Sequence, residues 1–198
     1  MFKDCTSLKS IPNLPAINLA EGCYKYMFQN CASFNSEIIL PALQLAKECY
    51  FCAFNACTSL TTAPKILATS LAEGCFYGLF ANCSSLTNVN ENYLPNNSVP
   101  KQCYRAMFKN CTSLKTAPIL PSLTLTNECY YEMFYGCSKL NHVTMLATNK
   151  SATDCLYSWV SGVASTGTFY KHKDMASLST GSNGIPSGWE VINYEEWV

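Results

Sequence analysis

The chain has 198 residues, a length typical of one domain, and its 48% hydrophobic and 13% aromatic residues supply a substantial core. Its 13 basic residues balance its 13 acidic ones. This sparse charge argues against a nucleic-acid partner or a polybasic membrane contact, because both need clustered Lys and Arg. No apolar run approaches the roughly 18 residues of a membrane span, so no direct membrane insertion is expected.

Most of the chain repeats one pattern of cysteines. The first column is Cys5, Cys31, Cys57, Cys83, Cys111 and Cys137. The second column is Cys23, Cys49, Cys75, Cys103, Cys129 and Cys155. Steps within a column are 26 residues, with one step of 28. A fixed period of this size predicts a solenoid, in which each repeat buries its apolar face only against its neighbours.

The pattern is already present at the first residues. Met1-Phe2-x-x-Cys5 matches Met27-Phe28-x-x-Cys31, so the chain is expected to begin inside a truncated repeat, as a fragment of a longer protein. The N-terminal end of the stack is then open and offers a surface for self-association. The opening residues carry neither the basic nor the apolar stretch of a secretory signal.

The repeat from Leu60 to Leu86 illustrates the expected local structure. Leu60 opens a short extended run that Pro64 interrupts, and Ser70 then offers a helix N-cap. Apolar residues follow at offsets of 0, 1, 4, 5 and 8, a helical spacing, at Cys75, Phe76, Leu79, Phe80 and Cys83. Each unit is therefore expected to pair one strand with one helix, which makes the fold an α/β solenoid.

Residues that tolerate a left-handed backbone predict where most of these helices end. The residue before each first-column cysteine is Asp4, Asn30, Ala56, Asn82, Asn110 or Gly136. Asn and Gly adopt the left-handed conformation more readily than other residues.

The later units depart from the regular pattern. The two additional residues lie in the connection from Asn90 to Ser98, which is expected to bulge from the surface as an insertion. The last helix, from Cys155, is degenerate, and Val163 stands where the next cysteine is due. Beyond it the chain is rich in Ser, Thr and Gly, with strand-like stretches around Phe169 and Trp189. We therefore expect a solenoid over 1–163 and a β-rich capping segment over 164–198.

The repeat resembles the BspA-type leucine-rich repeats of bacterial surface proteins. The motif that carries the resemblance is Ala53-Phe54-Asn-Ala-Cys57-Thr-Ser-Leu60, and it recurs over residues 1 to about 163. The ending from Gly167 to Trp189 is similar to the C-terminal segment on related repeats of gut anaerobes and their phages. The second cysteine column departs from the common form. The resemblance implies a right-handed stack of 26-residue strand–helix units used for adhesion or other binding, and it implies no catalytic residue.

The cysteines are expected to be small buried residues, with no disulfide and no metal. Two cysteines eight residues apart on a helix lie about 12 Å apart along its axis, beyond the roughly 4.4–6.8 Å between Cα atoms that a disulfide spans. The same offset does not bring four sulfurs together around zinc. Cys49-Tyr-Phe-Cys52 has the spacing of a redox motif, a minor alternative. Cys52 is unique to its unit and is expected to be the most exposed thiol.

Two columns of variable residues are candidate binding sites. One follows the leucine that opens each strand: Lys9, Asn35, Thr61, Thr87, Lys115, Asn141 and the adjoining His142. Its hydroxyls and amides suit sugars or peptide backbone, unless they are simply the polar face of a strand. The other lies two residues beyond each second-column cysteine: Lys25, Phe51, Tyr77, Arg105, Tyr131 and Tyr157. Tyr and Arg favour interfaces, although aromatic rings could also lie flat between adjacent helices.

These features predict a non-enzymatic binding or adhesion module of a bacterial cell-surface protein that recognises a protein or a glycan through its repeats. No phosphate-binding loop, nucleophile motif or metal-ligand set is present. No cofactor is expected, and His142 and His172 are expected at the surface or in the capping segment. The alternative is a structural or receptor-binding component of a phage virion or another protein assembly. The expected location is accordingly the cell surface or extracellular space, with the virion as the alternative.

Overall fold

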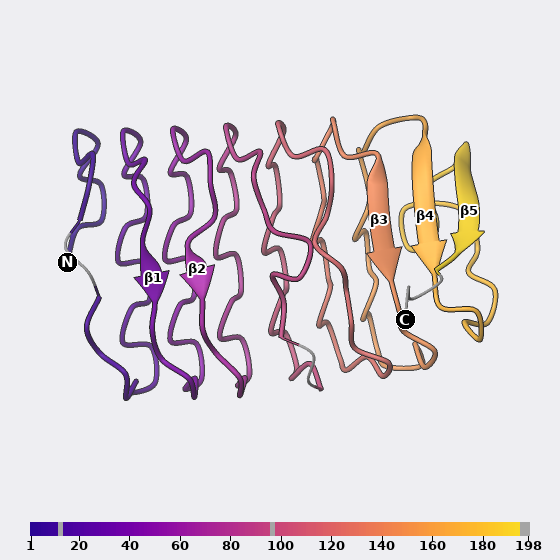
Figure 1. The fold of residues 1–198 in the computed structure, drawn as a ribbon, viewed down its shortest axis with the longest axis horizontal. Helices are drawn as coiled ribbons and strands as arrows, with labels where there is room; N and C mark the ends of the chain where they lie inside the picture. The colour runs from indigo at the N-terminus through magenta and orange to yellow at the C-terminus, as the bar shows by residue number, and fades with distance from the viewer. Residues whose placement is uncertain (12–13, 96–97, 195–198) are drawn as a thin grey trace.

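The computed structural model describes residues 1–11, 14–95 and 98–194. The chain runs as a series of similar turns, each lying beside the next from the N-terminal to the C-terminal end (Figure 1). Parallel bridges join positions one repeat apart, such as Asn18 with Gln44 and Gln44 with Ser70. The cysteine period is therefore also the register in which the repeats stack.

The strands lie on one side of the stack and pair in parallel. β1 (Ile39–Leu40) pairs with β2 (Lys65–Ile66), and Ile39 faces Lys65, one period along the chain. A second sheet has the order β3-β4-β5. These strands are β3 (His142–Met145), β4 (Gly167–Lys171) and β5 (Trp189–Asn193).

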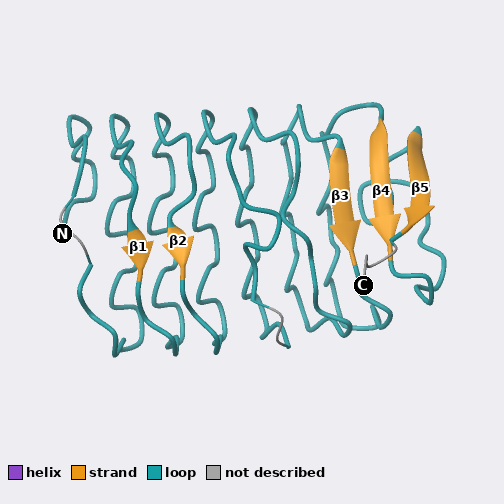
Figure 2. Cartoon of the chain, in the orientation of Figure 1, coloured by secondary structure: helices purple, strands orange, loops and turns teal. Residues whose placement is uncertain are grey.

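The predicted α/β class is wrong, because the residues that the structure describes contain no helix (Figure 2). The segments expected to be helical are runs of turns with a left-handed residue at every fourth position. In one repeat these are Gly22, Tyr26 and Asn30, with φ angles of 63°, 58° and 61°. An α-helix keeps φ negative throughout, so this backbone is a different structure and the strand–helix unit is a strand–turn unit.

Hydrogen bonds show what stabilises these turns. The N–H of Met27 donates to Tyr24 O three residues back, at 3.2 Å, whereas the N–H of Phe28 donates across to Ala53 O in the next repeat, at 2.9 Å. This alternation recurs along the runs, so about half of their N–H groups bond between repeats, as in a sheet. An α-helix would satisfy the N–H groups beyond its first turn internally and donate none of them to a neighbouring repeat. The inter-repeat bonds offset the cost of the left-handed residues, about 1–2 kcal/mol each outside glycine.

Two columns of aromatic rings form the centre of the core. The rings of one column have centroids between 5.3 and 6.3 Å apart: Phe2, Phe28, Phe54, Phe80, Phe108, Phe134 and Trp159. The rings of the other stack in the same way: Tyr24, Tyr50, Phe76, Tyr104 and Tyr130. Ring faces meet across the repeat boundaries, except that Trp159 is tilted by 56° to Phe134, so each repeat covers the apolar face of the one before it.

The C-terminal segment continues the last sheet. Its β4 pairs with β3 of the repeats, and Phe169 on β4 meets Trp159 edge-on with centroids 6.2 Å apart. The indole N–H of Trp159 donates to Gly184 O at 2.9 Å, and that of Trp189 donates to Ala164 O at 2.8 Å. The boundary at residue 163 stays a prediction, and residues 195–198 of the segment lie outside the described residues.

Candidate functional site

The structure brings the six residues of the second predicted column into one continuous row across the turn side of the stack. We call this row the outer column: Lys25, Phe51, Tyr77, Arg105, Tyr131 and Tyr157. Phe51 and Tyr77 stack with centroids 4.4 Å apart, and Tyr131 and Tyr157 with centroids 4.7 Å apart. The Arg105 guanidinium lies 3.9 Å from the Tyr131 ring centroid and links the two pairs.

Each cation of the outer column is also held by a carboxylate from the following repeat. Lys25 Nζ lies 2.6 Å from Glu48 Oε2, and this hydrogen bond raises the Lys25 pKa. Arg105 pairs in the same way with Glu128. The cations are thus fixed over the rings and locally neutralised, so the column offers oriented polar and aromatic groups without a strong net charge.

The rings stack face to face and present their edges to solvent. Tyr157 is 43% exposed, and the other rings of the column are half-buried. Rings do lie flat between repeats, as the alternative interpretation expected, but they lie between turns instead of helices. Stacked pairs of this kind stabilise the fold by about 0.5–1.5 kcal/mol each beyond their burial. Stacking therefore fixes the rings, and their exposed edges remain available for contact.

The first predicted column lies on the strand side and forms a backbone ladder in two parts. Asn35 N donates to Lys9 O at 3.2 Å, and Thr87 N donates to Thr61 O at 3.0 Å. Thr61 Oγ1 also donates to Asn35 Oδ1 at 3.1 Å. Beyond the insertion, Asn141 N donates to Lys115 O at 3.0 Å. Thr61 is half-buried, and the other side chains of the ladder are exposed: Lys9, Asn35, Thr87, Lys115 and Asn141.

The two histidines lie apart, near the C-terminal end of the stack. His142, on β3, faces the Tyr170 ring with centroids 4.9 Å apart, and partial burial lowers its pKa. His172 Nδ1 accepts a hydrogen bond from Asp174 N at 3.1 Å. Neither forms part of a nucleophile–base pair, and within the described residues no cluster of three His, Cys, Asp or Glu side chains is placed to hold a metal.

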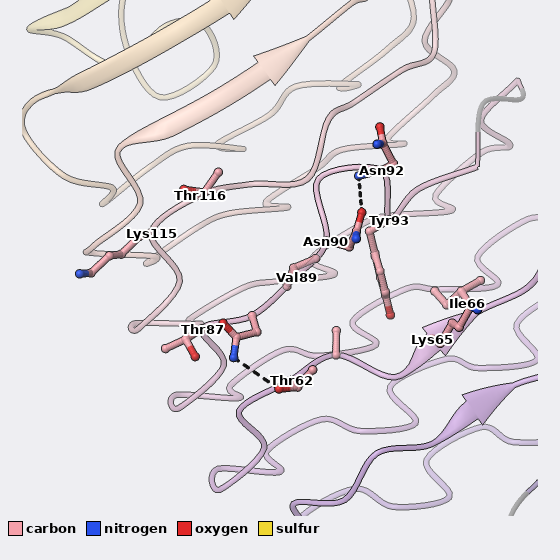
Figure 3. Close-up of a pocket in the computed structure, with 12 residues that line it drawn as sticks. Thr62, Lys65, Ile66, Thr87, Val89, Asn90, Asn92, Tyr93, Lys115 and Thr116 are labelled. Atoms are coloured by element: carbon pink, nitrogen blue, oxygen red, sulfur yellow. Dashed lines mark hydrogen bonds between the residues drawn. The ribbon is translucent and has the colours of Figure 1, made fainter.

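A groove of about 630 Å³ lies between the two parts of this ladder, and the sequence pattern did not predict it (Figure 3). Its lining consists of Thr62, Ala63, Lys65, Ile66, Thr87, Asn88, Val89, Asn90, Asn92, Tyr93, Lys115 and Thr116. Part of the predicted insertion forms one wall: Asn90 and Asn92 are exposed, whereas the hydroxyl of Tyr93 turns inward and donates to Pro64 O at 2.6 Å. Residues 96 and 97 of the insertion lie outside the described residues. The irregular step of 28 residues was the available signal for this groove.

The cysteines differ from expectation at three positions. Cys5 and Cys23 are exposed, and both lie in the first turn of the stack that the structure describes. Cys52, expected to be the most exposed thiol, is only 8% exposed. A Cβ added to Gly78 would lie 2.7 Å from Cys52 Sγ, so the absent side chain of this glycine makes room for the thiol beneath the next repeat.

The remaining ten predicted positions are buried free thiols. In the first column the thiol donates to a phenylalanine carbonyl of the preceding repeat, as Cys83 Sγ does to Phe54 O at 3.1 Å. Burial raises the pKa of Cys83 to about 12. In the second column, Cys75 Sγ and Cys103 Sγ lie 3.4 Å apart without a covalent bond. Protonated, desolvated thiols of this kind are poor nucleophiles and poor metal ligands.

Comparison with known proteins identifies the repeat. Searches of curated proteins and of solved structures found no match. A family model described as "BspA type Leucine rich repeat region" matches six copies, over residues 1–90 and 23–163. These matches span most of the chain and coincide with the stacked turns, so the chain belongs to the BspA-type leucine-rich-repeat family.

Proposed function

We propose that this protein is a non-enzymatic adhesion module of a cell-surface protein and that it binds a protein partner through the outer column. Membership of the BspA-type family favours a protein-binding repeat scaffold. The observation that carries the proposal is the unbroken row of rings and cations across six repeats. At the end of this row, Arg105 lies over Tyr131, which stacks on Tyr157. No membrane-crossing helix is found among the described residues.

The chemistry of the column suits a protein surface. Tyr and Arg are the residues that most often dominate binding energy at protein interfaces. Here neighbouring rings hold each other in place, so little side-chain entropy remains to be lost when a partner binds. The row spans about 24 Å if successive repeats lie at the usual strand spacing of about 4.8 Å, a length typical of one side of a standard interface.

The pairing of the cations narrows the class of partner. Arg105 and Lys25 each contact a carboxylate of the following repeat, which reduces the attraction for a general polyanion. Binding through this surface therefore depends on shape and on individual hydrogen bonds to Tyr and Arg. These are features of a specific protein contact.

The test compares binding of the protein and of a double variant, Tyr131→Ala with Tyr157→Ala, to a panel of purified extracellular-matrix and serum proteins. Surface plasmon resonance should show binding to at least one panel member and about tenfold or greater weakening in the variant. The control is Leu43→Ala, since Leu43 is an exposed apolar side chain outside the column. Enzymatic deglycosylation of the panel should leave this binding unchanged. No binding to the panel, equal loss in the control, or loss on deglycosylation would overturn the proposal.

A further inference from the structure

The groove exists because the insertion breaks the strand-side ladder. Thr62 still bridges to Asn88 in the regular register, but the next residues leave it. Glu91 O instead accepts a hydrogen bond from Ile119 N of the following repeat, at 2.8 Å. β2 consequently pairs with β1 on one side only. A hollow opens where the regular stack would have carried another strand pair.

The lining is rich in groups that bond hydroxyls and contains no acid. It holds three Asn, three Thr and two Lys side chains and neither Asp nor Glu. Asn90 Oδ1 accepts from Asn92 N at 2.8 Å, which fixes the rim of the loop. Lys65 and Lys115, from repeats on opposite sides of the groove, are exposed and form no ion pair with any described residue. In Figure 3 the two lysines lie at opposite ends of the groove, so each ammonium group is available to a different part of an extended ligand.

The groove also has a fixed aromatic side chain. The Tyr93 hydroxyl is anchored on Pro64 O, and its ring lies 6.3 Å from the Phe80 ring of the core. In Figure 3 Tyr93 extends from the insertion between Val89 and the Lys65–Ile66 pair. Apolar C–H groups of a sugar ring pack well against such a surface, while amides and hydroxyls around it bind the ring's polar substituents.

We propose that this groove binds an acidic oligosaccharide, one that carries a uronic or sialic acid. Lys65 and Lys115 each pair with an acidic group at their own end of the ligand, the Asn and Thr side chains bond the sugar hydroxyls, and Tyr93 supports one ring face. Two lysines that form no ion pair with a described residue, in a lining without Asp or Glu, favour an anionic ligand over a neutral one. An acidic peptide fits less well, because the Tyr93 hydroxyl already occupies Pro64 O on the strand edge that a peptide would extend. This site is independent of the protein-binding proposal.

The test measures binding by isothermal titration calorimetry to trigalacturonate, a hyaluronan tetrasaccharide and 3′-sialyllactose. Lactose and cellotriose serve as neutral probes and hexaglutamate as the peptide probe. At least one acidic sugar should bind with a Kd of about 1 mM or tighter, at least about tenfold tighter than its neutral counterparts. Equal binding of neutral and acidic sugars, preference for hexaglutamate, or no binding of any acidic probe would overturn the proposal.

Variants separate this site from the outer column. Lys65→Gln and Lys115→Gln should each weaken binding of the acidic sugar by about fivefold or more, since each removes a charge-assisted contact. Both lysines are exposed, so these variants should fold. The matched control is Lys139→Gln, an exposed lysine outside the groove. Tyr157→Ala should also leave sugar binding unchanged, and a loss in either control would contradict a site in the groove.

Discussion

A cysteine of the first column combines small size with a hydrogen-bond donor. Cys83 is fully buried where successive turns pack closely, and its thiol donates to Phe54 O, which also accepts the N–H of Cys57. Alanine would fit the space but not donate, and larger donors would not fit. Cysteine meets both requirements at this position in each repeat.

Replacing Cys83 should separate the two contributions. Cys83→Ala should lower the free energy of unfolding by about 1–3 kcal/mol, because it removes a buried donor and leaves a small cavity. Cys83→Ser should lower it less, because the hydroxyl retains the donor. Urea denaturation followed by tryptophan fluorescence measures both, with Cys5→Ala as the exposed control. Equal losses for Ala and Ser would contradict a role for the hydrogen bond.

Thiol labelling reports directly on burial. In the native protein, Cys5 and Cys23 should react rapidly with a chromogenic disulfide reagent, and the other eleven thiols only on unfolding. Partial desolvation raises the Cys23 pKa, and burial raises the Cys52 pKa to about 11, so both carry less thiolate than an ordinary thiol near neutral pH. Mass spectrometry of the labelled peptides identifies the sites. Rapid labelling of Cys52 would contradict its position beneath Gly78.

At the scale of the element, the turn run shows why periodicity misled the sequence analysis. Offsets of 0, 1, 4, 5 and 8 fit a period of four as closely as one of 3.6, because the two differ little over eight residues. Some left-handed positions carry glycine or asparagine, such as Gly74 and Asn82, and these residues indicate a left-handed backbone in the sequence. Positions such as Glu48 and Gln102 have the same conformation without any local preference for it. There the inter-repeat hydrogen bonds, which a single repeat does not reveal, determine the backbone.

Two opposite substitutions test this backbone. Ala56 has a φ of 59°, so Ala56→Gly should relieve strain and raise the free energy of unfolding by about 0.5–1 kcal/mol. Gly78 has a φ of 58°, and Gly78→Ala adds both backbone strain and a clash with Cys52. This substitution should therefore lower the free energy of unfolding by about 1–3 kcal/mol. Urea denaturation measures both. A helix over these residues would reverse both signs, since alanine favours helices and glycine weakens them.

At the scale of the whole molecule, the cysteine spacing fixed how the repeats align but not the surface they make. Ile39 faces Lys65 and Thr116 faces His142 at the period read from the sequence. The groove depends on the path that the insertion takes, which the 28-residue step of the cysteine columns marks but does not describe. The outer column was predictable as a set of residues. Its stacking and its pairing with Glu48 and Glu128 required the turn geometry.

The stacked core also determines how stability depends on pH. Burial raises the pKa of Cys83 and Cys137 to about 12, from an ordinary thiol value of 9.0, and raises that of Tyr104 and Tyr130 well above 10.0. Below pH 9 these groups are protonated in both the folded and the unfolded chain. Above pH 9 the unfolded chain releases protons that the folded chain retains, so the unfolded state gains stability as pH rises.

The free energy of unfolding should therefore fall between about pH 9 and pH 12, with each shifted group contributing a slope of up to about 1.4 kcal/mol per pH unit. Urea midpoints measured in the presence of a phosphine reductant from about pH 7 to pH 10.5 test this, with reversibility checked on return to neutral pH. A Cys83→Ala, Cys137→Ala variant should start less stable yet show a shallower fall, because two of the shifted thiols are gone. A midpoint constant across this range would mean that the thiols and phenols are solvated in the folded protein, and would contradict the packed stack on which both binding surfaces are built.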